Sequence, residues 1–380
     1  MPGYQIDKSL WGGETFDALL ADVRQRRQEF EKQQYISHDI VERFKQIGVY
    51  RAMVPKAMGG DERSPMEFLQ MVETMAAADG SAGWVASFGM NPAYLAALPV
   101  ETIDKVWSSG PDVVFAGGIF PPQKAVKVDG GYRVSGRWKW GSGCMGAALI
   151  GVGIKEENEP LPRMAVFPAD KVKIEKDWDV IGMVGTGSHD LVVEDQFVPE
   201  EWTFVRGGKP NLESDFFRYP SLAFAAQVLA ITSAGLAREA LDVVQAEAAG
   251  RSSVTGAPNL GEREYVRIEI AQAEAKLRAS RAFFYQVTED AWNTIKAGGK
   301  PTKEQTNLIR LATTHLAHEC AEAVRMTYEV TGMTGAYARH PLNRILRDSR
   351  MVTQHAFMGR VTLMNAGAMF FGHDPLPGYL

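Results

Sequence analysis

The hydrophobic pattern of this chain changes period twice, and the order of the three resulting zones limits its fold more than any other feature. Across residues 15–109, apolar side chains recur at helical spacing, as at Phe16, Leu19 and Val23. Across residues 111–205 short alternating runs take over, and from about residue 215 long helical stretches return. We therefore predict an α+β protein in three parts: an N-terminal α-helical domain (1–110), a central antiparallel β domain (111–210) and a C-terminal four-helix bundle (211–380).

Local signals support each zone. Ser64 and Glu67 are spaced as a capping box, and Pro65 between them suits the first position of a helix. The turn at residues 129–131, with the alternating run that follows it, predicts a β-hairpin, and further strands are expected at residues 148–152, 164–167 and 191–193.

The bundle helices are expected at residues 222–249, 263–297, 302–331 and 341–371. Thr302 and Gln305 form the capping box that opens the third of them.

Composition excludes several classes of function. A net charge of −5 and scattered Lys and Arg give no footprint for nucleic acid or a membrane surface. Cys144 and Cys320 cannot build a disulfide framework or a metal cluster, and the spaced pair His315 and His318 is interpreted as packed or solvated. No signal peptide is expected, and no apolar run long enough to cross a bilayer. We expect a cytoplasmic protein that binds no metal.

The run Gly136–Gly143 combines two tryptophans with small residues. A planar heteroaromatic ring stacked near Trp140, with the Ser142 hydroxyl at its edge, would account for this composition, because glycines allow the backbone to approach closely. A β-turn carrying two core tryptophans would account for it equally well.

The C-terminal segment from His340 to Ala356 carries the first family resemblance. Its Arg347-Asp348 pair resembles the last flavin-contacting helices of the acyl-CoA dehydrogenases, in which a catalytic glutamate follows. Here that position falls on Ala356, and the alternative position of this base in the family falls near Ala225. Proton abstraction beside a thioester needs a positioned carboxylate. Dehydrogenase or oxidase chemistry is therefore disfavoured, and an ion-pairing role is expected for Arg347 and Asp348.

A narrower resemblance is to the flavin-dependent two-component aromatic hydroxylases, an oxygenase branch of this fold. Their pattern Gly-Arg-Trp-x-x-x-Ser-Gly-Cys matches residues 136–144. The resemblance implies that Ser142 contacts the flavin N5 and that Trp140 shields the ring, with Gly141 and Gly143 beside them. Residues 185–193 resemble the branch's Gly-Thr-Gly-Ser-x-Asp motif, although a loop entering a strand would also explain them.

The resemblance implies further cofactor contacts. Gly332 and Gly335 stand where dehydrogenases contact the flavin nucleotide, and Phe120 is placed near the flavin by family position alone. Arg251 corresponds to an arginine that reaches the cofactor phosphate across a subunit interface, and a surface salt bridge is the alternative.

Three residues are candidates for the substrate pocket. Trp84 ends a Gly-Ser-x-Gly-Trp motif that resembles the family's helix start near the pocket, and Asn91 stands where a substrate-binding histidine often occurs. His355 is the candidate that could exchange a proton with the substrate or orient it, although a core histidine bonded to backbone is the alternative.

The function implied is that of an oxygenase component. Reduced flavin (FADH2 or FMNH2), delivered by a separate NAD(P)H-flavin reductase, would react with dioxygen to a C4a-hydroperoxide that oxygenates a small aromatic substrate of phenol, indole or arylacetate type. The lack of a cationic cluster favours a neutral ring, although one arginine would suffice for an acid. An N-hydroxylating enzyme of the same branch and a non-catalytic helical scaffold remain alternatives. The resemblance also implies a homotetramer, consistent with the apolar segment 351–371.

Overall fold

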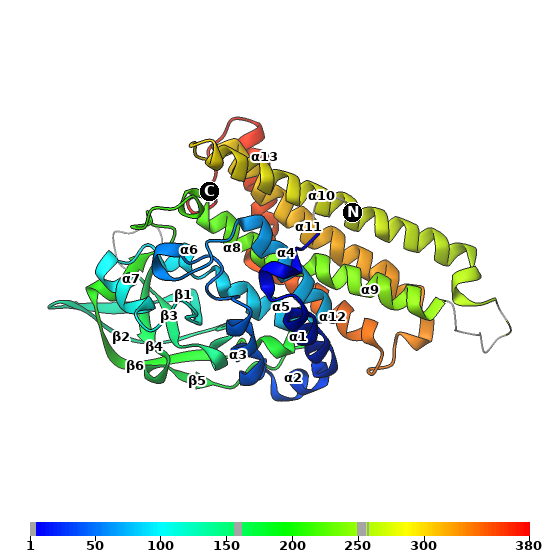
Figure 1. Ribbon diagram of the computed structural model, residues 1–380, viewed down its shortest axis with the longest axis horizontal. Coiled ribbons are helices and arrows are strands. Elements are labelled where there is room, and N and C mark those ends of the chain that lie inside the picture. The colour runs from blue at the N-terminus through cyan, green and yellow to red at the C-terminus, as the bar shows by residue number, and fades with distance from the viewer. Residues whose placement is uncertain (1–4, 156–161, 249–255, 257) are drawn as a thin grey trace.

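The computed structural model describes residues 5–155, 162–248, 256 and 258–380. The N-terminal part is helical, as expected, and lies between the β-sheet at one end of the molecule and the long helices at the other (Figure 1). Its helices are α1 (Glu14–Gln25), α2 (Arg27–Gln33), α3 (His38–Gln46), α4 (Pro65–Ala78), α5 (Gly80–Ala86), α6 (Pro92–Leu95) and α7 (Val100–Trp107). The capping box predicted at Ser64 and Glu67 opens α4.

The central part is a seven-stranded sheet in the order β5-β6-β2-β1-β3-β4-β7. Its strands are β1 (Phe115–Val128), β2 (Gly131–Trp138), β3 (Leu149–Lys155), β4 (Arg163–Pro168), β5 (Lys173–Glu175), β6 (Asp190–Pro199) and β7 (Thr203–Val205). The predicted hairpin joins β1 to β2, with Val128 opposite Gly131.

The prediction of a purely antiparallel sheet was wrong for one pair. β1 and β3 run parallel, with Phe115 opposite Leu149 and Gly118 opposite Val152. The segment between β2 and β3 causes this pairing. It carries the chain back to the end of the sheet where β1 begins, on the side of β1 away from β2. From there β3 runs in the same direction as β1. The same segment carries Trp140 and Ser142.

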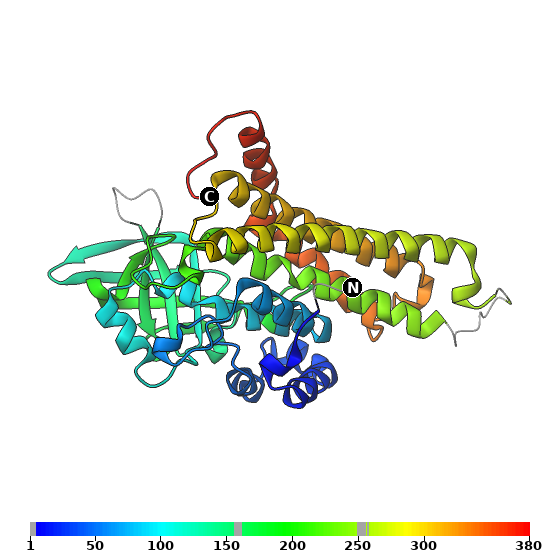
Figure 2. The same ribbon diagram turned by 45° about the horizontal axis from the view of Figure 1, so that its top comes forward.

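The C-terminal part is a bundle of long helices, and two of the four predicted helices are divided. Its helices are α8 (Ser221–Ala230), α9 (Thr232–Ala248), α10 (Glu264–Lys296), α11 (Lys303–Glu329), α12 (Pro341–Gln354) and α13 (Arg360–Phe370). The capping box at Thr302 opens α11 as predicted. α13, drawn in red, projects from the bundle instead of continuing α12 (Figure 2).

The division of the last helix has a local cause. His355 takes an extended conformation (φ −65°, ψ 139°), and its ring Nδ1 accepts the N–H of Phe357 at 3.3 Å. The ring therefore caps the turn that follows, and the helical hydrogen-bond ladder ends at Gln354. This break turns residues 355–357 away from the helix axis.

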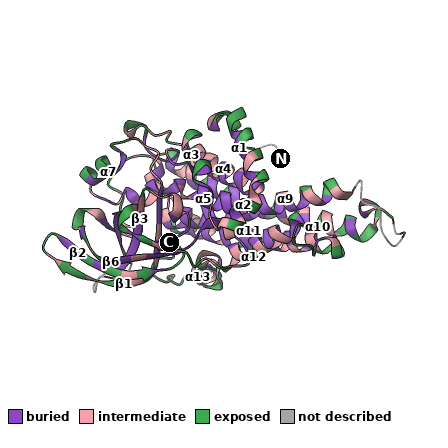
Figure 3. Cartoon of the chain, turned by 90° about the horizontal axis from the view of Figure 1, so that it is seen from below, coloured by how far each residue is buried: buried purple, intermediate pink, exposed green. Residues whose placement is uncertain are grey.

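The expectation that no apolar run could cross a bilayer also needs correction. Residues 221–248, which form α8 and α9, are long and apolar enough by length and composition. In their most apolar window, 89% of the residues are buried, so this segment is a core helix of the bundle. Buried residues gather in the middle of the molecule, around α4 and α5 (Figure 3).

Candidate active site

One cavity of about 560 Å³ lies where the sheet, the N-terminal helices and the bundle meet. This volume falls within the range of small-molecule sites, roughly 300–1,000 Å³. Its aromatic walls are Trp84, Phe88, Tyr94, Phe115, Phe120, Trp140, Trp178, Phe204 and Phe357. Ala225 and Ala356 also line it, and no Asp or Glu is among the described residues that do. Both positions where the family resemblance places the base of dehydrogenases thus lie at the cavity, and both are alanine.

The two tryptophans of the Gly136–Gly143 run have different environments. Trp138 is fully buried and donates its indole N–H to the carbonyl of Gly153 at 2.7 Å, so it belongs to the sheet core. Trp140 is 59% exposed and lines the cavity. Gly141 leaves no room for a side chain, because a Cβ there would lie 2.8 Å from Leu191. Gly143 has a φ of +72°, which favours glycine.

Ser142 begins a buried chain of hydroxyl groups. Its Oγ lies 2.7 Å from Oγ of Ser188, which in turn lies 2.7 Å from Oγ1 of Thr186. Thr186 donates to the carbonyl of Met183 at 2.8 Å, and Trp84 donates its indole N–H to Ser142 at 3.2 Å. Ser142, Ser188 and Thr186 all line the cavity.

The direction of this chain follows from counting hydrogens, since each hydroxyl has one. Thr186 uses its hydrogen on a carbonyl, which can only accept, so Ser188 must donate to Thr186. Ser188 then has no hydrogen left to donate to Ser142, so Ser142 must donate to Ser188. Ser142 therefore keeps only a lone pair for a molecule in the cavity. It can accept a hydrogen bond there and cannot donate one.

The motif at residues 185–193 is thus more than a loop entering a strand. Gly187 has a φ of +57°, and a Cβ on it would lie 2.9 Å from Cβ of Tyr35. This tight turn places the hydroxyls of Thr186 and Ser188 side by side before β6 begins at Asp190. The sequence motif carried the signal, but the hydrogen-bond chain depends on contacts between distant segments.

Trp84 is positioned by the close packing of α5 on α4. The side chain of Asp79 caps α5 by accepting the N–H of Ala82 at 2.9 Å. At Gly83 a Cβ would lie 2.5 Å from the Cβ of Ala76, so only glycine allows this approach. Trp84, next in sequence, then contacts His355 edge to face, with ring centroids 5.7 Å apart.

His355 lines the cavity and is held neutral. Burial lowers its pKa to about 4, and the charges of Arg206 and Arg310 act in the same direction. Because Nδ1 accepts the N–H of Phe357, the ring proton lies on Nε2. His355 is thus suited to donate a hydrogen bond into the cavity, whereas a base with this pKa is weak at neutral pH.

Asn91 also lines the cavity. Its Nδ2 donates to the carbonyl of Val113 at 2.9 Å, and its buried Oδ1 bonds no described residue. Phe120 lines the cavity and is 47% exposed.

The other predicted cofactor residues lie elsewhere. Gly332 and Gly335 belong to the turn after α11 and are not among the residues that line the cavity. Arg251 lies outside the described residues. Arg347 pairs with Glu31 at 3.2 Å, and Asp348 lies 3.8 Å from Arg344, so both make ion pairs, though not with each other.

No group of three or more His, Cys, Asp or Glu suited to a metal gathers among the described residues. His318 bonds the carbonyl of Met358 at 2.9 Å, and His315 packs against Phe283.

Sequence reasoning missed the cationic groups at the cavity. Lys139 and Arg206 line it, and Arg310 stacks on the ring of Phe357, which also lines it. The interpretation that no cationic cluster exists was wrong, because Arg206 and Arg310 are distant in sequence and meet only in the fold. Neither residue belongs to a spaced motif that could have identified it.

Comparisons with known proteins identify the family of the chain. Residues 14–99 match the family model "Acyl-CoA dehydrogenase, N-terminal domain", and residues 226–360 match "Acyl-CoA dehydrogenase, C-terminal domain". An indole-3-acetate monooxygenase of Pseudomonas putida is 56% identical over 98% of this chain and 97% of its own.

Two further relatives extend the comparison. The oxygenase component of an FADH2-dependent resorcinol hydroxylase from Rhizobium sp. is 30% identical over 82% of both chains. The crystal structure of 3-HSA hydroxylase from Rhodococcus sp. RHA1 superposes with a TM-score of 0.91 at 26% identity, covering 98% of this chain and 100% of that one. The chain therefore belongs to the acyl-CoA dehydrogenase family, in its branch of flavin-dependent monooxygenases.

Proposed function

We propose that this protein is the oxygenase component that hydroxylates an indole ring bearing an acetate side chain, as in indole-3-acetate. The name of its Pseudomonas relative, at 56% identity over nearly the whole chain, supports this substrate class. The observation that carries the reaction type is the cavity itself, which presents a hydrogen-bond acceptor at Ser142 and contains no carboxylate among its described lining residues.

The residues present fit a reduced flavin. Trp140 and Trp178 supply flat apolar surface at the cavity, and Ser142 offers one lone pair beside them. A reduced flavin carries a hydrogen on N5 that can be donated to this lone pair, whereas an oxidised flavin has none there. When bound, reduced flavin supplies the two electrons with which dioxygen is split, one oxygen atom entering the ring and the other leaving as water.

The remaining residues exclude water and orient the substrate. The aromatic walls keep the reacting centre dry, which limits the loss of activated oxygen to free hydrogen peroxide. His355, neutral and protonated on Nε2, donates a hydrogen bond to the substrate, and Asn91 offers its free carbonyl oxygen to an indole N–H. Neither residue has to exchange a proton at neutral pH for this role.

The alternatives make different demands on the cavity. Dehydrogenase or oxidase chemistry would need a carboxylate at position 225 or 356, where alanine stands. N-hydroxylation uses the same apolar cavity and requires an amine on the substrate. Turnover of an arylamine with retention of the ring hydrogens would favour it.

The test is reconstitution of the purified protein with a flavin reductase, NADH, and FMN or FAD in turn. We expect indole-3-acetate to be hydroxylated with little hydrogen peroxide release, and resorcinol and aniline to raise the peroxide fraction. Equal peroxide yield with every ring offered would contradict the proposed function.

Assembly and location belong to the same proposal. We propose a homotetramer assembled through the bundle, because several large apolar side chains of α13 and its neighbours are exposed. These are Val361, Leu363, Met364, Phe370 and Phe371. Sedimentation velocity of wild type and of a Phe370→Ser, Phe371→Ser double variant tests this. A wild type that sediments as a monomer, like the double variant, would contradict the proposal. We further propose a cytoplasmic enzyme that uses a separate reductase and binds no membrane.

A further inference from the structure

Two arginines that stack on Phe357, a residue of the cavity wall, have no carboxylate partner among the described residues. Arg206 lines the cavity directly after β7. Arg310, on α11, has only 5% of its surface exposed and is not itself a lining residue, but it stacks on Phe357, which is. Nε of Arg206, and both Nε and Nη1 of Arg310, are buried without a hydrogen bond to any described residue. Buried polar groups in proteins are nearly always hydrogen-bonded, so three such donors together need an explanation.

The two guanidinium groups converge on one aromatic ring. Arg206 lies 5.4 Å from the ring centroid of Phe357, and Arg310 lies 5.0 Å from the same centroid. Phe357 follows His355 and Ala356 in the turn that ends α12. Both positive charges therefore lie beside His355, the substrate-pocket candidate, and Ala356, where the family resemblance places the base of dehydrogenases.

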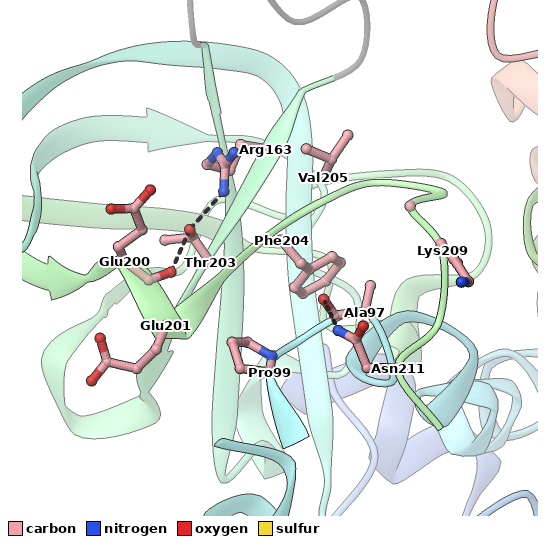
Figure 4. A pocket seen from close by; sticks show the side chains of 11 residues that line it. Ala97, Pro99, Arg163, Glu200, Glu201, Thr203, Phe204, Val205, Lys209 and Asn211 are labelled. Carbon is pink, nitrogen blue, oxygen red and sulfur yellow. Dashed lines mark hydrogen bonds between the residues drawn. The ribbon is translucent and has the colours of Figure 1, made fainter. Parts of the chain in front are cut away.

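Neighbouring contacts fix the segment that carries Arg206. Val205 pairs with Arg163 across β7 and β4, and the N–H of Arg206 donates to the carbonyl of Pro162 at 3.1 Å. Further along, Asn211 donates to the carbonyl of Ala97 at 3.3 Å (Figure 4). Arg310 is held by its place on a long helix. The charges are thus positioned before any ligand arrives, which reduces the entropy cost of binding one.

The open depression in Figure 4 is a different site. It lies at β7 and is bordered by exposed Glu200, Glu201 and Lys209, so acidic side chains are among the residues that line it. At Phe357 the situation is reversed, because no Asp or Glu is among the described residues that line the main cavity.

Burial makes this positive charge energetically unfavourable until an anion arrives. Removing a guanidinium from water without a counter-charge costs free energy, and stacking on Phe357 offsets only part of it. Burial lowers the pKa of Arg310 to about 10, with Arg206 adding repulsion, so Arg310 is still a cation at neutral pH.

We propose that Arg206 and Arg310 form a carboxylate subsite that binds the acetate group of the substrate. The inference rests on the proposed function and deepens it, since it names the groups that distinguish indole-3-acetate from indole. A carboxylate has two oxygens and can accept N–H hydrogen bonds from both guanidinium groups at once. With the acid held at the Phe357 end, the indole ring extends toward Trp84 and Ser142. A flavin phosphate is the other anion that this pair of arginines suits, and the test below separates the two.

The experiment measures binding without turnover. Wild type, Arg206→Gln and Arg310→Lys are titrated by calorimetry with indole-3-acetate and with its neutral analogue indole-3-acetamide, and anaerobically with reduced FMN. Arg310→Lys keeps the positive charge and loses the planar guanidinium with its several N–H donors. Lys209→Gln is the control, because Lys209 is an exposed cation on the segment that carries Arg206. We expect both arginine variants to weaken indole-3-acetate binding by at least about 30-fold, with indole-3-acetamide and reduced FMN within about threefold of wild type.

The outcomes separate the two proposals. Wild type that binds neither ring compound would overturn the proposed function, whatever the variants do. Wild type that binds the acid, with Arg206→Gln unchanged, would overturn the subsite alone. A loss confined to reduced FMN would assign the arginines to the flavin phosphate and also overturn the subsite. If circular dichroism shows that Arg310→Lys does not fold, the binding data of Arg206→Gln alone decide whether the subsite exists, because Arg206 is the less buried of the two arginines.

Discussion

The indole N–H of Trp84 donates a hydrogen bond of 3.2 Å to the hydroxyl oxygen of Ser142. The donor belongs to α5 in the helical N-terminal part and the acceptor to the segment between β2 and β3. This bond occupies one lone pair of Ser142, while the hydroxyl chain through Ser188 takes its hydrogen. Two structural units together thus leave Ser142 a single acceptor position at the cavity.

The direction of the hydroxyl chain can be reversed by removing its last acceptor. In Thr186→Val, Ser188 loses the group to which it donates and can donate to Ser142 instead. We expect the preference for reduced over oxidised flavin to fall roughly tenfold, the value of about one hydrogen bond. Equilibrium dialysis of both flavin states under anaerobic conditions measures the ratio.

Thr353→Val is the matched control for that variant, because its hydroxyl donates to the carbonyl of Arg350 on α12, away from the chain. If Thr186→Val keeps the wild-type ratio, the chain does not set the role of Ser142.

His355 makes stability depend on pH in a defined direction. Its pKa is about 4 when folded and 6.5 when unfolded, so the unfolded state binds more protons between these values. The contribution of the neutral ring is fully present above pH 6.5 and is lost as pH falls toward 4. The loss amounts to roughly 3 kcal/mol in the free energy of unfolding.

Urea unfolding of wild type and His355→Gln at pH 7 and pH 4.5 measures this effect, because titration of all other groups is common to both proteins. We expect wild type to lose roughly 2–3 kcal/mol more than the variant between the two pH values. Equal losses would mean that His355 titrates normally in the folded protein.

Gly83 is required for the packing of α5 on α4. A Cβ at this position would lie 2.5 Å from the Cβ of Ala76, so Gly83→Ala forces the helices apart. We expect a loss of about 1–3 kcal/mol in stability, together with weaker flavin binding as Trp84 shifts. Gly367→Ala on α13 is the control, since no atom lies within 4 Å of its added Cβ.

That control should gain about 0.5–1 kcal/mol, because alanine is the better helix former. Thermal unfolding of Gly83→Ala and Gly367→Ala measures both changes in stability relative to wild type. A Gly83→Ala protein as stable as wild type would show that α4 and α5 can separate without cost.

A carboxylate introduced at position 356 should compete with the acetate group of the substrate for Arg206 and Arg310. Ala356 adjoins Phe357, on which Arg206 and Arg310 both stack, so Ala356→Glu places an acid within the cavity beside them. We expect affinity for indole-3-acetate to fall at least about tenfold. Ala356→Gln has the same shape without the charge and should retain more of it.

Calorimetric titration of both variants gives the comparison. Equal losses in Ala356→Glu and Ala356→Gln would indicate crowding of the cavity in place of competition between charges.

Features encoded by neighbouring residues could be predicted from the sequence. The capping boxes at Ser64 and Thr302 and the hairpin before β2 depend on residues a few positions apart, and each was confirmed. Helical spacing likewise located the long helices of the bundle. Ser142, Trp140 and Trp84, which the family motifs contain, line one cavity together with the candidate His355, and their roles there stay predictions.

Features that depend on distant contacts could not be predicted. The parallel pairing of β1 with β3 is set by where the chain returns, and a strand's own residues do not encode its partner's direction. The break at His355 has no proline, and it depends on a histidine ring acting as a cap. Arg206 and Arg310 belong to different structural units, so their convergence on Phe357 exists only in the folded protein.

The central claim is that the cavity transfers one atom of dioxygen to an indole ring using electrons from reduced flavin. Single turnover of the reduced-flavin complex with ¹⁸O₂ and indole-3-acetate, followed by mass spectrometry, tests it most directly. We predict one ¹⁸O atom in the organic product and the other in water. A product without ¹⁸O, or quantitative hydrogen peroxide with unchanged indole-3-acetate, would contradict the account.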